Sequence, residues 1–60
     1  MHLIRFVWEG IAREIELKPN EAYIALNVLE KVGYRIAEVR ERKYGYHERI
    51  YIMEEIENGK

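Results

Sequence analysis

The stretch best suited to chemistry is residues 40–49, RERKYGYHER, in which basic and aromatic side chains are interleaved. Arginine and lysine neutralise phosphates, and tyrosine and histidine rings can stack on bases. The side chains that we expect to contact nucleic acid are Arg40, Arg42, Lys43, Tyr44, Tyr46, His47 and Arg49. Glu41 and Glu48 favour a simpler interpretation, in which these charges pair across the strands of a solvated hairpin. Both interpretations stay open at this point.

Metal binding and catalysis find little support in the sequence. His2 and His47 are the two histidines, and they lie on different expected hairpins, so no metal site is predicted. The chain has no serine, threonine or cysteine to act as a nucleophile. Its four glycines are isolated, whereas a phosphate-binding loop groups them. We expect a binding protein and no enzyme, with no cofactor, no metal and no small-molecule substrate.

A chain of 60 residues forms a single small domain with a marginal core. Such domains are usually stabilised by disulfides, by a metal or by a second copy, and cysteine is absent here. The sequence therefore predicts a homodimer. The residues that we expect at its interface are Ile24, Val28, Val32, Tyr51 and Met53.

The composition is unusual in what it lacks. Serine, threonine, aspartate, glutamine and cysteine are all missing, while Lys and Arg total 10 and every one of the 11 acidic residues is glutamate. Many glutamates and basic residues with few heat-labile residues are typical of hyperthermophiles. We expect an archaeal or viral protein from such a habitat; chance bias in a short chain and a designed sequence are the alternatives.

Charge and hydropathy argue against a polycation and against a membrane protein. The net charge is −1, although residues 34–51 hold five basic against three acidic residues, a net +2. No apolar run approaches the roughly 18 residues that a membrane span needs. No signal peptide is recognisable, so an intracellular, cytoplasmic location is expected, without a membrane partner.

The clearest element is a helix over residues 20–33. Asn20 is expected to cap its start, Glu21 suits the positive end of its dipole, and Gly33 suits its end. Its apolar residues cover an arc of roughly 200°, about twice that of an ordinary surface helix. The width of this arc predicts that the helix is covered from more than one direction.

A hairpin is expected on each side of this helix. Strands 2–8 and 11–17 around Glu9-Gly10 pair Trp8 with Ile11 and Arg5 with Glu14, which satisfies burial and charge together. This two-residue loop requires a positive φ at Glu9. Strands 34–41 and 46–54, joined by a turn over residues 43–45, make the second hairpin.

The second hairpin has a less regular pattern than the first. A three-residue loop would pair Arg40 with Glu48 and Ile36 with Ile52. The spacing of Ile36 and Val39 is helical, so a helix over 35–43 is the alternative. Residues 55–60 are expected to form a frayed tail. The predicted fold class is α+β, in the order β-β-α-β-β with two antiparallel hairpins flanking one helix; the alternative is a hairpin followed by two helices and a strand.

This order of elements is similar to that of the swapped-hairpin DNA-binding domains of the AbrB and MazE type, which dimerise. Their Gly-Arg-x-x-Ile/Leu-Pro signature is not found, since Ile11-Ala12-Arg13 follows Gly10. The function that we expect first is binding of nucleic acid, in the manner of a transcription regulator. The alternative is a protein–protein adaptor or inhibitor, encoded by a virus or plasmid and acting on a host protein, in which Trp8 would contact the partner.

Overall fold

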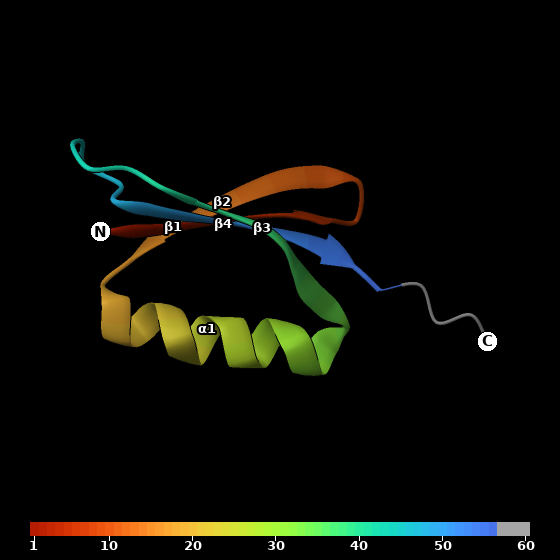
Figure 1. Cartoon of the computed structure of the whole chain (residues 1–60). Coiled ribbons are helices and arrows are strands. Elements are labelled where there is room, and N and C mark those ends of the chain that lie inside the picture. The colour runs from red at the N-terminus through yellow and green to blue at the C-terminus, as the bar shows by residue number, and fades with distance from the viewer. Residues whose placement is uncertain (57–60) are drawn as a thin grey trace.

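One helix lies against one face of a four-stranded sheet (Figure 1). The computed structural model describes residues 1–56. The elements are β1 (His2–Trp8), β2 (Ile11–Leu17), α1 (Pro19–Val32), β3 (Tyr34–Glu41) and β4 (Arg49–Glu55). The predicted order β-β-α-β-β is confirmed. The alternative of a helix over 35–43 is wrong, because most of this segment belongs to β3.

The two hairpins belong to one sheet, with strand order β2-β1-β4-β3. Its centre is a parallel pair, in which Ile4 of β1 lies opposite Tyr51 of β4. The helix provides the crossover that a parallel pair requires. Within this chain the two hairpins therefore pair with each other.

The register of the first hairpin is the predicted one. All seven pairs agree, from Trp8 opposite Ile11 to His2 opposite Leu17. The turn has φ 53° at Glu9 and φ 78° at Gly10, the left-handed region at both central positions. This geometry matches the twist of the flanking strands, which is why two-residue loops adopt it.

The predicted register of the second hairpin is wrong. Arg40 lies opposite Ile50, and Ile36 lies opposite Met53, because the ladder skips Ala37 in a β-bulge. The bulge places Ile36 and Val39, three residues apart, on the same face of the sheet, which explains their spacing without a helix. The connection is also longer than predicted and runs over residues 42–48.

The helix begins one residue earlier than the sequence indicated. Lys18 is the N-cap residue and Pro19 is the first helical position, so the predicted cap at Asn20 is wrong. Proline suits that position because its missing N–H has no helical partner to lose. The Glu21 carboxylate accepts a hydrogen bond of 3.4 Å from the Lys18 backbone amide. At the other end the Gly33 amide donates to Leu29 and Glu30, as expected of a C-cap.

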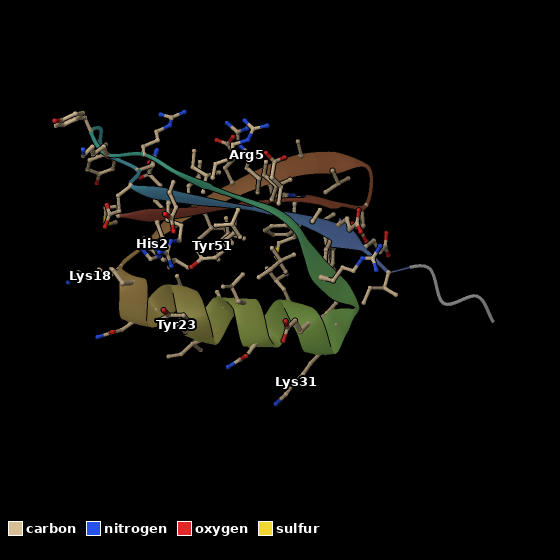
Figure 2. The ribbon with its side chains drawn as sticks, in the orientation of Figure 1. His2, Arg5, Lys18, Tyr23, Lys31 and Tyr51 are labelled. Carbon is tan, nitrogen blue, oxygen red and sulfur yellow. The ribbon has the colours of Figure 1, made fainter. Side chains whose placement is uncertain are left out.

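The core lies between the helix and the sheet. Its buried side chains are Ile4, Ala22, Leu26, Leu29, Tyr34, Tyr51 and Met53. Tyr51 lies between the layers, as Figure 2 shows, and Met53 belongs to the same cluster. Neither side chain is on the surface of the chain, which corrects the expectation that they form a dimer interface. Ile24, Val28 and Val32 are each more than half exposed.

The end of β4 is part of the fold. Glu55 belongs to the strand, and the Ile56 amide donates a hydrogen bond of 2.7 Å to the Gly33 carbonyl. The predicted frayed tail therefore does not include residues 55 and 56, and residues 57–60 lie outside the described residues. Within residues 1–56, no helix has the length and apolar character needed to cross a membrane.

Candidate nucleic-acid interface

The predicted site residues lie in and around loop 42–48, the connection between β3 and β4. The loop extends past the ends of the strands, on the side where the chain begins (Figure 1). Gly45 has φ 120°, a backbone conformation that residues other than glycine rarely adopt. The Arg42 amide donates a hydrogen bond of 2.9 Å to the Glu48 carbonyl, which closes the loop at its base.

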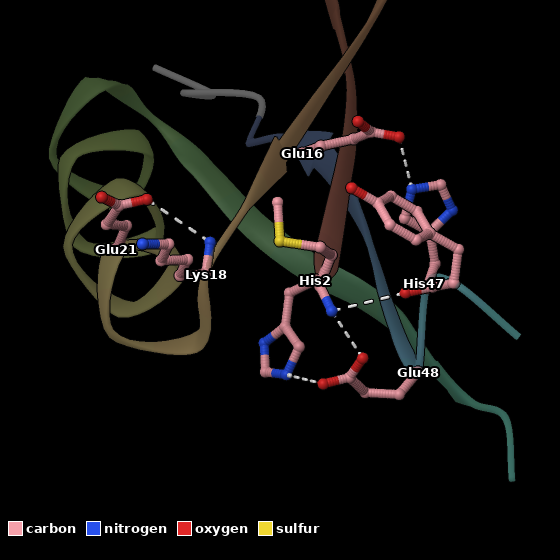
Figure 3. A network of polar contacts seen from close by, with 8 residues as sticks. His2, Glu16, Lys18, Glu21, His47 and Glu48 are labelled. Atoms are coloured by element: carbon pink, nitrogen blue, oxygen red, sulfur yellow. Dashed lines mark hydrogen bonds and ion pairs between the residues drawn. The ribbon is translucent and has the colours of Figure 1, made fainter. Parts of the chain in front are cut away.

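The amino terminus holds one side of this base (Figure 3). The Met1 ammonium group lies 2.6 Å from a Glu48 carboxylate oxygen and 3.3 Å from the Tyr46 carbonyl. The Glu48 amide in turn donates to the Met1 carbonyl at 3.2 Å. The hydrogen bond from the ammonium group lowers the pKa of the Glu48 carboxyl below its ordinary value of 4.5. The predicted pairing of Arg40 with Glu48 is therefore wrong.

A second contact holds the loop from the edge of the sheet. His47 Nε2 lies 2.6 Å from Glu16 Oε2 on β2, a contact that is visible in Figure 3. The Tyr46 and His47 rings meet edge to face, with centroids 5.0 Å apart. His47 is thus half-buried and engaged with a carboxylate, and its ring is not free to stack on a base.

Two of the arginines that were predicted to contact phosphates also form ion pairs with carboxylates. Arg40 Nε donates to Glu38 at 2.8 Å, and this pairing raises the pKa of the guanidinium above its ordinary value. Arg49 donates to Glu41 at 2.8 Å and to the Tyr51 hydroxyl at 3.3 Å. These arginines support the simpler interpretation of the stretch, that of charges paired within the hairpin, although their partners are not the predicted ones.

The tip of the loop differs from its base. Arg42 and Lys43 are exposed, and within the described part of the chain neither makes an ion pair. Tyr44 is 84% exposed and Tyr46 is 64% exposed. Three of the seven predicted residues therefore contact carboxylates: Arg40, His47 and Arg49. The other four are exposed to solvent around Gly45: Arg42, Lys43, Tyr44 and Tyr46.

A second feature, an apolar groove, was not predicted as a site. It runs between α1 and the first hairpin and has a volume of about 630 Å³. Its apolar lining consists of Phe6, Trp8, Ile15, Val28, Leu29 and Val32. Trp8 stacks on Tyr34, with centroids 6.3 Å apart and 17° between the planes, and it still has 40% of its surface exposed. The wide apolar arc of the helix was the signal in the sequence for this groove.

No group of three or more potential metal-ligating side chains occurs among residues 1–56. Comparisons with protein-family models, with curated proteins and with solved structures find no match to this chain.

Proposed function

We propose that the protein binds single-stranded nucleic acid through the tip of loop 42–48. The main support for this proposal is that two basic side chains of the loop form no ion pair with a carboxylate. Arg42 and Lys43 have no carboxylate partner among the described residues, and they lie beside a tyrosine that is 84% exposed. Cations and accessible aromatic rings on one short loop are what binding of a nucleic-acid strand requires.

Each group at the tip has a separate role in this proposal. Arg42 and Lys43 neutralise backbone phosphates, which supplies affinity without sequence preference. Tyr44 and Tyr46 offer ring faces to unpaired bases. Arg40, His47 and Arg49 hold the loop in shape through their carboxylates, so their contribution is indirect. Single strands are favoured over duplexes because exposed rings stack only on bases that are themselves unpaired.

The proposal is tested by fluorescence anisotropy with single-stranded oligonucleotides over a series of salt concentrations. For single strands, each phosphate contact contributes about 0.7 to the slope of log K against log salt. Removing both cations, in Arg42→Ala/Lys43→Ala, should therefore reduce the slope by about 1.4. Arg35→Ala is the matched control, because Arg35 is exposed on the same strand pair but binds Glu54 beyond the bulge. Absence of binding at low salt would refute the proposal.

A substitution at Tyr44 separates stacking from charge. Tyr44→Ala should weaken binding about 5- to 150-fold while leaving the salt slope unchanged, since stacking contributes about 1–3 kcal/mol per base. Tyr23→Ala, an exposed tyrosine on the helix, is the control. If duplexes bind as tightly as single strands, and Tyr44→Ala has no effect, the loop contacts phosphates alone.

Binding of a protein partner is the second candidate function, and the apolar groove beside Trp8 favours it. A surface of this kind marks protein interfaces more often than nucleic-acid interfaces. Under this alternative, Trp8→Ala would abolish the interaction and the cation substitutions at the tip would not change it.

A further inference from the structure

The two free edges of the sheet differ in how they are protected. On β3 the bulge at Ala37 interrupts the ladder, a common device against pairing with another chain. The other edge strand, β2, has seven consecutive regular pairs with β1 and contains no bulge, proline or lysine. Its other side pairs with no strand among residues 1–56. Of the two edges, β2 is therefore the one able to accept another strand.

Both glutamates of β2 already contact residues of their own chain, whereas Arg13, on the helix side, makes no ion pair among the described residues. Glu14 is bound by Arg5 at 2.8 Å and Glu16 by His47 at 2.6 Å. Arg5 and Glu14 lie on the face of the sheet away from the helix, where Figure 2 shows Arg5. A strand docking on this edge would meet Glu14 neutralised by Arg5 and Glu16 already in contact with His47, so the repulsion between its carboxylates and those of the docking strand is weakened.

An apolar strip borders the same edge on the helix side. Its members are 37–65% exposed and come from the first hairpin and from one side of α1: Trp8, Ile11, Ile15, Ile24, Val28 and Val32. Ile24, Val28 and Val32 follow one another at intervals of four residues, so they form a continuous line along the helix. Lys31 points away from the sheet, as Figure 2 shows.

We propose that a second copy of this chain covers the β2 edge and the apolar strip together. The two β2 strands pair antiparallel about a twofold axis through Glu14, which joins the sheets into one of eight strands. Because this axis is perpendicular to the sheet, both helices lie on the same face. The helical line of Ile24, Val28 and Val32 then faces the same line of the partner subunit above the joined strands.

The choice of register follows from the residues of β2. Centring on Glu14 pairs Ile11 with Leu17 of the partner subunit, and Arg13 with Ile15 of the partner subunit, so the full strand length is used. A shift of two residues in either direction would place Arg13 or Ile15 opposite its own copy and would shorten the ladder. In the proposed register Glu14 meets its own copy, and each carboxylate retains its Arg5.

The available surface and the size of the core fit a second copy as the occupant. An interface of standard size takes about 800 Å² from each partner. That is about a sixth of the 4639 Å² that the chain exposes. A domain of this length has little core of its own, and here Ile4 is the largest side chain that is fully buried. The inference does not depend on nucleic-acid binding, and it places the two copies of loop 42–48 at opposite ends of the joined sheet.

Sedimentation of the full chain tests the contribution of the apolar strip. The wild type should sediment as a dimer at micromolar concentration, and Val28→Lys should raise the dissociation constant at least about tenfold, because it places an unpaired cation in the interface, in the groove that Arg13 also lines. Tyr23→Lys is the matched control, with a similar exposure on another side of the same helix, and it should leave the constant unchanged. A wild type that is monomeric at high micromolar concentration would overturn the proposal and leave the strip to a different protein.

Disulfide cross-linking tests the twofold axis itself, since the chain contains no cysteine. Opposite residues of paired strands have Cα atoms about 5.5 Å apart, within the range that a disulfide spans. Glu14→Cys should therefore form a covalent dimer rapidly under mild oxidation. Ala12→Cys, exposed on the same face of β2, lies about 14 Å from its own copy in this register and should cross-link slowly. Equal rates, or faster cross-linking of Ala12→Cys, would overturn the proposed pairing even if a dimer forms.

Discussion

His47 and Glu16 are joined by a contact of 2.6 Å that ties loop 42–48 to β2, across 31 positions of the sequence. We predict that His47→Ala or Glu16→Gln increases amide hydrogen exchange at residues 43–46 about tenfold, because one of the two restraints on the loop is removed. The free energy of unfolding should change by less than about 1 kcal/mol, the usual contribution of a surface ion pair. Arg35→Ala, which breaks an ion pair distant from the loop, should leave this exchange unchanged. Unaltered exchange in both loop variants would contradict the role of the contact.

Stability should fall in acid through the contact of Glu48 with the Met1 ammonium group. The hydrogen bond from this group holds the pKa of Glu48 below 4.5 in the folded chain. A carboxylate with a lowered pKa in the folded state stabilises the fold above its unfolded pKa, and this contribution is lost as the pH falls through the folded pKa. The Arg40 guanidinium lowers the pKa of Glu38 in the same way.

The measurement is urea unfolding between about pH 2 and pH 6, which spans both states of the Glu48 carboxyl. Glu48→Gln should flatten the decline in the free energy of unfolding below pH 4.5, and acetylation of the amino terminus should flatten it without altering the side chain. The same slope in all three proteins would show that the contact does not persist in solution.

The first hairpin could be predicted in detail because its determinants are local. Glu9 and Gly10 form a two-residue loop, and such a loop sets every pair that follows. The alternation of apolar residues and the Arg5–Glu14 pair independently favour the same register. The turn, the burial pattern and the charge pair all predict the same register, which is why this hairpin could be predicted from the sequence.

The second hairpin was predicted less well, because distant contacts decide its geometry. The bulge at Ala37 places Val39 on the helix side of the sheet. Alanine is not a residue type that indicates a bulge, so the sequence does not predict one there. The base of the loop is held by Met1 and by Glu16 of β2, which lie 30 or more positions away in sequence. Of the three predicted site residues that contact carboxylates, His47 binds the distant Glu16, whereas Arg40 and Arg49 bind glutamates of their own hairpin. The parallel pairing of β1 with β4, which buries Tyr51, was likewise not visible in any local pattern.

The hydroxyl of Tyr34 should contribute measurably to stability. It donates a hydrogen bond to the Val7 carbonyl, and its ring meets Phe6 edge to face and stacks on Trp8. Tyr34→Phe retains the ring and removes the hydrogen bond, so the thermal midpoint should fall by about 4–8 °C, the effect of one such bond in a domain of this size. Tyr23→Phe should not change the midpoint, since that tyrosine is exposed. A midpoint equally unchanged in Tyr34→Phe would show that the hydrogen bond makes no net contribution.

Thermal stability should be high if the composition reflects a hyperthermophilic source. Five ion pairs link charged groups of the described residues, and two further contacts join a histidine to a glutamate. Ion pairs lose less stability on heating than other interactions, because the cost of desolvating charged groups falls as the temperature rises. We predict a midpoint above about 90 °C by calorimetry, outside the range of about 45–65 °C in which most mesophilic domains unfold. Sodium chloride at about 1 M should lower the midpoint by screening these pairs. A midpoint in the mesophilic range would argue against such a source.

The turn of the first hairpin should tolerate a stabilising substitution at Glu9. This residue has φ 53°, and its side chain makes the left-handed conformation unfavourable by about 1–2 kcal/mol. Asparagine adopts that conformation more readily, and Asn-Gly is the preferred pair for such turns. Glu9→Asn should therefore raise the free energy of unfolding by about 0.5–1 kcal/mol, measured in denaturant. Glu9→Gln removes the charge and retains the strain, so it should have no such effect. If both variants gain equally, the cause is electrostatic and the turn carries no strain that asparagine relieves.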